Sequence, residues 1–363
     1  MKKVAIIGRG LFGRETYGIH RNTKELLINL DKIVPDGALE LIVPRREAGG
    51  CNFSHIKVVG LGLRNTPGSK LLDRADAFLF KNVFTRLHAM KSSAITVDML
   101  LQFPRYGCDV ITIYDCIPEI FPEHYEIRGN VAWKDKLLRR QKRAIQKSRL
   151  ILTDSNNAKS DIQRFYNVSD DRIEVIPCGW QHFIRVKADP SILDKLGLDG
   201  KPFFFSLGSR LPHKNIKWIS CAAQKNPNYT FVISGSARSN KDFRFEGEKL
   251  PNMIFAGYLS DGEVKALMQH CKAFIQPSMY EGFGIPPMEA MSVGANCIVS
   301  DKASLPEVYK KSVWYINPYD YDHIDLDEIM SRPKESNDLI LSEYSWEKSA
   351  RKLWVILQKL AVG

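Results

Sequence analysis

The sequence lacks any hydrophobic run that approaches the roughly 20 apolar residues needed to cross a bilayer. Its charged first residues are followed by only four apolar ones, Val4–Ile7, which is too short for the apolar segment of a secretory signal peptide. It also lacks short-period repeats and low-complexity tracts. We therefore expect a folded protein that stays in the cytoplasm, with Val4–Ile7 as its first β-strand.

Cysteine is scarce, and no two of the seven cysteines have the C-x-x-C spacing of a zinc site or a thioredoxin-like motif. Free thiols buried in a reducing compartment are the expected state. The seven are Cys51, Cys108, Cys116, Cys178, Cys221, Cys271 and Cys297.

Length and composition are those of a soluble two-domain protein. The chain has 363 residues, of which 44% are hydrophobic and 26% charged. The formal net charge is +11, and most of the basic excess lies in residues 1–184. This asymmetry indicates a negatively charged partner for the first half, either nucleic acid or an anionic membrane. No recognised nucleic-acid-binding module is present, which disfavours nucleic acid.

Short apolar runs alternate with segments of helical periodicity, such as Lys134–Arg149 and Asp261–His270. This alternation predicts parallel sheets covered by helices on both faces, and therefore a doubly wound α/β fold that occurs twice. A boundary is expected after Ile176-Pro177-Cys178-Gly179. The predicted strands are Val4–Ile7, Leu39–Val43, Val110–Tyr114, Leu150–Thr153, Ile173–Ile176, Phe203–Leu207, Thr230–Ile233, Met253–Ala256, Ala273–Gln276 and Cys297–Val299.

Gly8-Arg9-Gly10-Leu11-Phe12-Gly13 has the G-x-G-x-x-G spacing of a dinucleotide-binding loop directly after the first strand. Two features count against a nicotinamide cofactor. Gly18 falls within the first turns of the expected helix, and no acidic residue ends the strand that follows at Leu39–Val43. A glycine-rich loop that lines a cleft and ordinary turn glycines are the other interpretations, and an NAD(P)-dependent oxidoreductase remains the alternative function.

The most informative segment is Gln276–Met291, in which a strand ends, a glycine-containing loop follows, and two prolines open a short helix that Gly294 terminates. The helix N-terminus is expected to present free amides to a phosphate. Glu281 lies in the loop and Glu289 in the first turn of the helix. A carboxylate accepts both hydroxyls of a ribose, which would suit Glu289 to a nucleotide. A carboxylate that only complements the helix dipole is the other interpretation.

Two basic residues, Arg210 and Lys214, follow the strand Phe203–Leu207. They are expected at the carboxyl end of that strand, where open α/β sheets bind their ligands. Two fixed cations stabilise the charge of a departing pyrophosphate without a metal. A solvated basic loop is the alternative.

Together these motifs resemble the retaining glycosyltransferases of family 4, from about Leu150 to the end of the chain. The segment EGFGIPPMEAM carries the resemblance, supported by the Arg and Lys after the first strand of the second domain and by GYLSD, SLPEV and YSWE further along. The resemblance implies a GT-B fold: residues 1–178 with a returning helix 346–363 bind the acceptor, and residues 179–345 bind the nucleotide sugar. It implies retention of anomeric configuration.

The resemblance also implies residue roles. Glu281 lies near the donor sugar, Glu289 holds the ribose, and Arg210 and Lys214 bind the diphosphate. The residues implied to hold donor sugar and phosphate are Gly282, Phe283, Gly284, Ile285 and Ser304, with Gly10 and Gly18 contributing from the first domain.

The first half resembles the family less closely. Ile113–Pro118 is similar to a segment that usually reads His-Asp, but Tyr114 stands in place of the histidine. Asp115 keeps the carboxylate and is expected to contact an acceptor or sugar hydroxyl, with a structural aspartate as the alternative.

No metal or other cofactor is expected. Asp325-Leu326-Asp327 has the D-x-D spacing of metal-dependent glycosyltransferases, but it falls in a predicted surface helix, far in sequence from Glu281. Arg210 and Lys214 already supply positive charge, so activity without a divalent ion is predicted.

Two basic amphipathic segments, Lys134–Arg149 and Ser69–Arg86, are candidates for contact with an anionic membrane on its cytoplasmic face. Helices packed on their own domain are the alternative. The predicted function is transfer of a hexose, from a donor such as GDP-mannose, dTDP-rhamnose or a UDP-hexose, to a lipid-linked surface glycan.

Overall fold

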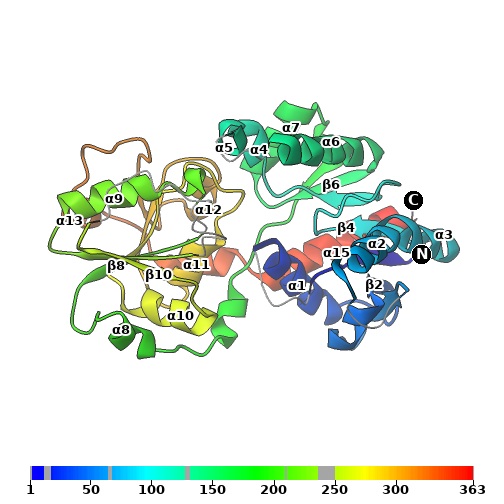
Figure 1. The fold of residues 1–363 in the computed structure, drawn as a ribbon, viewed down its shortest axis with the longest axis horizontal. Coiled ribbons are helices and arrows are strands. Elements are labelled where there is room, and N and C mark those ends of the chain that lie inside the picture. The colour runs from blue at the N-terminus through cyan, green and yellow to red at the C-terminus, as the bar shows by residue number, and fades with distance from the viewer. Residues whose placement is uncertain are drawn as a thin grey trace.

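The computed structural model describes residues 2–11, 18–63, 68–126, 131–208, 211–235 and 250–362. Two parallel sheets with helices packed around them lie side by side, and the C-terminal helix runs from the second to the first (Figure 1). The predicted doubly wound α/β architecture, occurring twice, is confirmed.

The first sheet has seven parallel strands in the order β3-β2-β1-β4-β5-β6-β7. Alternate residues of β1 pack into different clusters: Val4 and Ile6 on one face, Ala5 and Ile7 on the other. The sheet is therefore buried on both sides. Its strands are β1 (Val4–Ile7), β2 (Leu39–Pro44), β3 (Lys57–Leu61), β4 (Ile95–Asp98), β5 (Val110–Thr112), β6 (Leu150–Thr153) and β7 (Ile173–Val175).

Helices connect these strands and cover both faces of the sheet. From Lys70 to Ser92 the chain is helical without a break, because a π-helical turn, η2 (Phe80–Phe84), joins α2 to α3. The helices are α1 (Gly18–Asp31), α2 (Lys70–Leu79), α3 (Thr85–Ser92), α4 (Ile117–Ile120), α5 (Glu123–Glu126), α6 (Val131–Lys147) and α7 (Asn156–Tyr166), with short 3₁₀ turns η1 (Arg45–Gly50) and η3 (Asp170–Arg172).

The second sheet repeats this topology with six parallel strands in the order β10-β9-β8-β11-β12-β13. Phe204 on β8 packs into one cluster, and Phe203 and Phe205 pack into the other. The strands are β8 (Phe203–Leu207), β9 (Thr230–Ser234), β10 (Met253–Gly257), β11 (Ala273–Gln276), β12 (Cys297–Ser300) and β13 (Trp314–Ile316).

Helices of the second part are mostly short. The α10 helix begins with a capping box: the hydroxyl of Ser260 accepts from the Glu263 amide, and the Glu263 carboxylate accepts from the Ser260 amide. The helices are α8 (Ser191–Lys195), α9 (Ile216–Lys225), α10 (Asp261–His270), α11 (Ile285–Met291), α12 (Leu305–Tyr309), α13 (Leu326–Ser331) and α14 (Asn337–Glu343), with 3₁₀ turns η4 (Gln181–Arg185) and η5 (Pro212–Lys214).

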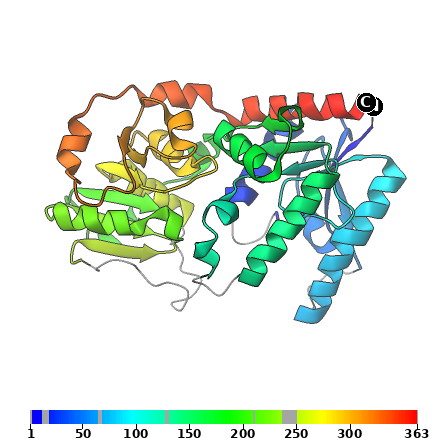
Figure 2. The same ribbon diagram turned by 90° about the horizontal axis from the view of Figure 1, so that it is seen from above.

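The last helix, α15 (Trp346–Val362), returns to the first sheet and packs against α1. The Lys2 amide donates to the Ala361 carbonyl at 3.1 Å, so the two ends of the chain lie together (Figure 2). The first part of the fold is therefore built from both ends of the sequence, with α15 as one of its helices. A division of function at residue 178 stays a prediction.

Both sheets have a point at which the strand order reverses, between β1 and β4 and between β8 and β11. Open α/β sheets bind ligands beyond the carboxyl ends of the strands at such points. The described residues contain no helix with the length and apolar character that crossing a membrane requires. All seven cysteines are free, and Cys108, Cys116, Cys178 and Cys297 are buried.

Candidate active site

Lys214 and Glu281 meet at the strand reversal of the second sheet. Lys214 ends η5, which follows β8, and Glu281 lies in the loop after β11. The Nζ atom of Lys214 lies 2.7 and 2.8 Å from the two oxygens of Glu281, and Gln276 donates to Oε1 at 2.8 Å. Glu281 is only 8% exposed, so its carboxylate has a fixed position and a neutralising partner.

Asp115, at the carboxyl end of a strand of the first sheet, lies close enough to Lys214 and Glu281 to interact with them electrostatically. It follows β5, and its carboxylate accepts from the Ile117 amide at 3.1 Å. Burial raises the pKa of Asp115, the charge of Glu281 raises it further, and the charge of Lys214 opposes both. Asp115 therefore interacts electrostatically with the Lys214–Glu281 pair across the two sheets.

Loops at the carboxyl ends of the two sheets are in direct contact. A Cβ atom on Gly282 would lie 2.3 Å from the backbone oxygen of Tyr114, so only glycine fits beside Glu281. The Ser155 hydroxyl donates to the Gly282 carbonyl at 2.6 Å. Tyr114 itself is buried and donates its hydroxyl to the Met99 carbonyl at 2.9 Å. The hydroxyl of Tyr114 therefore has a structural hydrogen-bond partner, and replacement of the histidine by Tyr114 stays a prediction.

Asp154 is a further carboxyl group at this contact, and the motif analysis did not identify it. It follows β6, is buried, and its Oδ1 has no hydrogen bond among the described residues. Burial raises the pKa of Asp154 well above its usual range, and the charges of Asp115, Glu307 and Glu281 add to the effect. The protonated form of Asp154 is therefore favoured, which does not suit it to act as a nucleophile.

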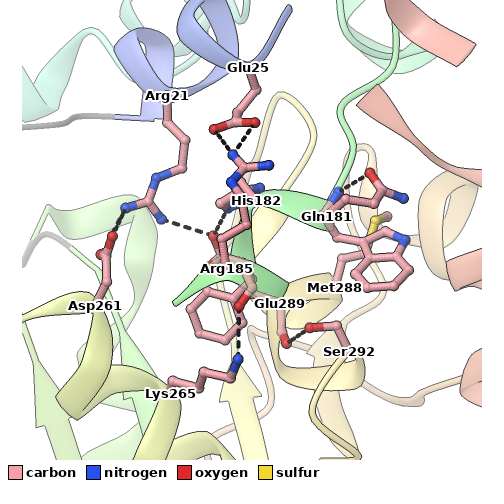
Figure 3. Close-up of polar contacts among 12 residues, drawn as sticks. Arg21, Glu25, Gln181, His182, Arg185, Asp261, Lys265, Met288, Glu289 and Ser292 are labelled. Carbon is pink, nitrogen blue, oxygen red and sulfur yellow. Dashed lines mark hydrogen bonds and ion pairs between the residues drawn. The ribbon is translucent and has the colours of Figure 1, made fainter. Parts of the chain in front are cut away.

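Glu289 lies on α11, and its carboxylate binds residues from distant parts of the sequence (Figure 3). Its Oε1 accepts from Arg21 Nη1 at 3.0 Å and lies 2.7 Å from His182 Nε2. Arg21 comes from α1 and also forms two 2.8 Å bonds to Asp261 on α10. Burial acts to raise the pKa of Glu289, but His182 and Arg21 outweigh it and the net shift is downward.

Glu289 therefore remains ionised although it is only 3% exposed. Its Oε2 has no hydrogen bond among the described residues and keeps its lone pairs for a ligand. Arg21 ends the segment Tyr17–Arg21, which resembles a loop of the family, but its contact with Glu289 spans 268 residues and was not predicted. His182 is a functional candidate that motif spacing did not reveal, because its contact with Glu289 spans 107 residues.

One prediction about α11 is wrong. The helix N-terminus was expected to present several free amides to a phosphate, but Pro286 and Pro287 have no N–H and the Met288 amide donates to the Tyr309 hydroxyl at 3.1 Å. The Ile285 amide is what remains of the first turn. A diphosphate bound here would therefore depend mainly on basic side chains.

The other predicted donor-binding residues hold the loop in shape. Phe283 is buried against Tyr344, with ring centroids 5.5 Å apart. Gly284 has φ +84°, and the buried Ser304 hydroxyl donates to the Glu281 carbonyl at 2.9 Å. Ile285 begins α11. Direct contact of these residues with a donor stays a prediction.

The glycine-rich loop after β1 does not have the form that a dinucleotide would need. The Gly10 amide, which would face a pyrophosphate, donates instead to the Glu47 carboxylate at 2.7 Å. A carboxylate in this place repels phosphate. Gly18 opens α1, and space lies around it for a side chain. Gly13 lies outside the described residues.

Two further predictions concern charge and metal. Arg210 lies outside the described residues. Of the two predicted cations, the structure therefore describes the position of Lys214. In the D-x-D sequence, Asp325 accepts from the Glu328 amide to cap α13, and Asp327 accepts from the Tyr229 hydroxyl at 2.6 Å. Both carboxylates thus have structural partners.

Comparison with known proteins places the second half in a recognised group. Residues 189–346 match the family described as glycosyl transferases group 1. The chain is similar to O-antigen chain mannosyltransferase B of Escherichia coli, 29% identical over 65% of this chain, and to O-antigen chain mannosyltransferase RfbU of Salmonella typhimurium, 29% identical over 58%. The matches span 65% and 57% of these relatives, less than two thirds of either.

Solved structures extend the likeness to the whole chain. Sucrose-phosphate synthase from Thermosynechococcus elongatus aligns with a TM-score of 0.72 at 14% identity, covering 99% of both chains. HepE from Anabaena in complex with UDP-glucose aligns with a TM-score of 0.66 at 16% identity, covering 99% of this chain and all of that one. The chain therefore has the GT-B fold of glycosyltransferases, and its residues 189–346 match glycosyl transferases group 1.

Proposed function

We propose that this protein is a hexosyltransferase that transfers mannose or a related hexose from a nucleoside-diphosphate sugar to a hydroxyl of a growing surface glycan. The relatives named above are O-antigen mannosyltransferases, which supports this donor sugar and this class of acceptor. The observation that carries the proposal is the Lys214–Glu281 pair at the strand reversal of the second sheet, facing Asp115 of the first.

In this proposal the donor diphosphate lies against Lys214, with Arg210 as the second cation. Charge develops on the diphosphate as the bond to the sugar C1 breaks, and fixed cations stabilise it without reorganisation. Glu281, held by Lys214 and Gln276, orients the sugar hydroxyls. Glu289 accepts a ribose hydroxyl through Oε2.

We further propose that the acceptor hydroxyl attacks the face that the diphosphate leaves, which retains the anomeric configuration. The acceptor oxygen forms the new bond to C1, and its proton passes to the departing phosphate oxygen. Burial raises the pKa of Asp154 well above its usual range, which disfavours the ionised form that a covalent nucleophile needs. Burial also raises the pKa of Asp115, opposed by the charge of Lys214. Domain contact at Gly282 excludes water from the reaction.

The donor is tested by thermal shift against UDP, GDP, dTDP and NAD, because a ligand that binds the native state raises its melting temperature. We expect a nucleoside diphosphate to stabilise the protein and NAD to have no effect. Stabilisation by NAD alone would favour the alternative oxidoreductase, which the Glu47 contact with Gly10 disfavours.

Transfer is expected to need no divalent metal. In excess EDTA the initial rate should remain within about twofold of the untreated rate, because Lys214 and Arg210 supply the charge that a metal otherwise provides. The measurement is nucleotide release from the donor with and without EDTA. Complete loss of activity that Mn²⁺ restores would contradict this expectation.

We propose that the helix from Lys70 to Ser92 lies on an anionic membrane that carries the acceptor. Large apolar side chains are exposed along it, including Leu71 at 76% and Phe78 at 45% exposure, beside exposed basic residues. The second candidate is weaker: on α6 the apolar residues Ala144 and Ile145 are buried in the sheet's own core, and of the predicted stripe Trp133 is the exposed member, at 56%.

Changing Leu71 and Phe78 together to glutamine is expected to weaken binding to vesicles of phosphatidylglycerol and phosphatidylcholine at least tenfold, since burial of each side chain stabilises binding by about 1.5–3 kcal/mol. Co-sedimentation measures the effect. Leu339→Gln is the matched control, because Leu339 is 52% exposed on α14 of the second part. Equal sedimentation of all three proteins would refute the membrane contact.

A further inference from the structure

We propose that Trp346 is a positioning residue for the donor site, which acts through His182 to fix the hydrogen bond that holds Glu289. The inference rests on the proposed function, because it takes Glu289 as the group that receives the ribose. It assigns a role in nucleotide recognition to a residue of the C-terminal helix, which otherwise packs against the first part of the chain.

The three side chains form a buried chain of hydrogen bonds. Trp346 is 1% exposed, His182 6% and Glu289 3%. The Nε1 atom of Trp346 donates to Nδ1 of His182 at 3.0 Å, and Nε2 of His182 lies 2.7 Å from Oε1 of Glu289. The last of these contacts is seen in Figure 3.

The indole fixes the tautomer of the imidazole. An indole N–H can only donate, so Nδ1 of His182 must present a lone pair to it. The proton of the neutral ring is then on Nε2, which points at the carboxylate and donates to it. A second proton on Nδ1 would place two N–H groups against each other in a buried place. His182 therefore donates to Glu289 in a fixed direction.

Trp346 is itself held in place. Its backbone amide donates to Oε1 of Gln181 at 3.0 Å, and a Cβ atom on Gly179 would lie 2.3 Å from the amide nitrogen of Trp346. The rest of α15 packs along α1, the helix that carries Arg21. Two helices thus hold the Glu289 carboxylate in place. Arg21 of α1 binds it directly, and Trp346 of α15 acts through the hydrogen bond from His182.

The consequence is that Oε1 of Glu289 is occupied by two donors, and Oε2, which has no hydrogen bond among the described residues, is left to accept from the ribose. In Trp346→Phe an aromatic ring is kept but the N–H is lost, so nothing holds Nδ1 of His182. The imidazole is then free to turn, and its hydrogen bond from Nε2 to the carboxylate loses its fixed direction. The carboxylate should turn, and the bond to the ribose should be lost.

Calorimetry with GDP or UDP, and with the 2′-deoxy form of each, tests the inference. The wild type should prefer the ribose form, and Trp346→Phe should bind it roughly tenfold more weakly and lose that preference. Trp354→Phe is the matched control on the same helix, since no hydrogen bond from its indole to a described residue is present, and it should behave as the wild type.

Two further measurements separate positioning from packing. In His182→Gln the side-chain amide donates an N–H and has no tautomers. Adding Trp346→Phe to His182→Gln should therefore weaken nucleotide binding only slightly. The ¹⁵N spectrum of labelled wild-type histidines, assigned by comparison with His182→Gln, should show His182 protonated on Nε2 alone.

The outcomes are distinguishable. A wild type that binds none of GDP, UDP and dTDP overturns the proposed function itself. A wild type that binds and prefers ribose, with an unchanged preference in Trp346→Phe, overturns the role of Trp346. An Nδ1 proton on His182 in the wild type overturns it even if Trp346→Phe does not fold.

Discussion

Replacing Glu281 by glutamine is expected to lower kcat by about 1000-fold. The carboxylate is fixed by Lys214 and Gln276 at the strand reversal of the second sheet. Loss of one preorganised electrostatic group at a reacting centre typically costs 10²–10³ in kcat. Glutamine keeps the shape of the side chain and removes its charge, so Lys214 loses its neutralising partner. Turnover with saturating donor measures the effect.

The control for this variant is Glu335→Gln, an exposed carboxylate on the second part whose change should leave kcat within twofold. Circular dichroism should show both variants folded. A kcat for Glu281→Gln within about threefold of the wild type would show that the reaction takes place elsewhere.

Replacing Glu289 by glutamine is expected to raise the donor KM and the nucleotide Kd by about 10–100-fold, with a smaller effect on kcat. Hydrogen bonds to an ionised group contribute about 1.5–3 kcal/mol, and the ribose would lose such a bond. Arg21 would also face a neutral amide in place of a carboxylate, although it keeps its bonds to Asp261. Initial rates over a range of donor concentrations separate KM from kcat.

Glu263→Gln is the comparison for this variant. Glu263 caps α10 beside Asp261 but makes no contact with Glu289 or Arg21 among the described residues, so its loss should affect stability and leave the donor KM unchanged. A fall in kcat without a change in KM for Glu289→Gln would place Glu289 at the reacting sugar instead of the ribose.

Local patterns predicted most of the fold. All ten predicted strands are present, and the predicted helix Asp261–His270 is α10. Three strands of the described residues were not predicted. β3 (Lys57–Leu61) is an edge strand with glycine and only partial burial, β4 (Ile95–Asp98) follows a helix almost directly, and β13 (Trp314–Ile316) is a short strand at the edge of the second sheet.

The candidate site was predicted in part. Glu281 and Lys214 follow adjacent strands, so strand topology alone brings them together. His182 and Asp154 were missed, and the contact of Arg21 with Glu289 was not predicted, because contacts between distant segments leave no local periodicity. That Pro286 and Pro287 offer no amide at the start of α11 was readable from the sequence, since proline has no N–H.

The central claim is that a nucleotide sugar binds in the second part of the chain, between Lys214 and Glu281 on one side and Glu289 on the other. A crystal structure with the nucleoside diphosphate that stabilises the protein most tests it directly. We predict a phosphate against Lys214 and a ribose hydroxyl at Glu289 Oε2. A nucleotide bound instead at Gly8–Gly10, with Glu47 displaced from the Gly10 amide, would contradict the account.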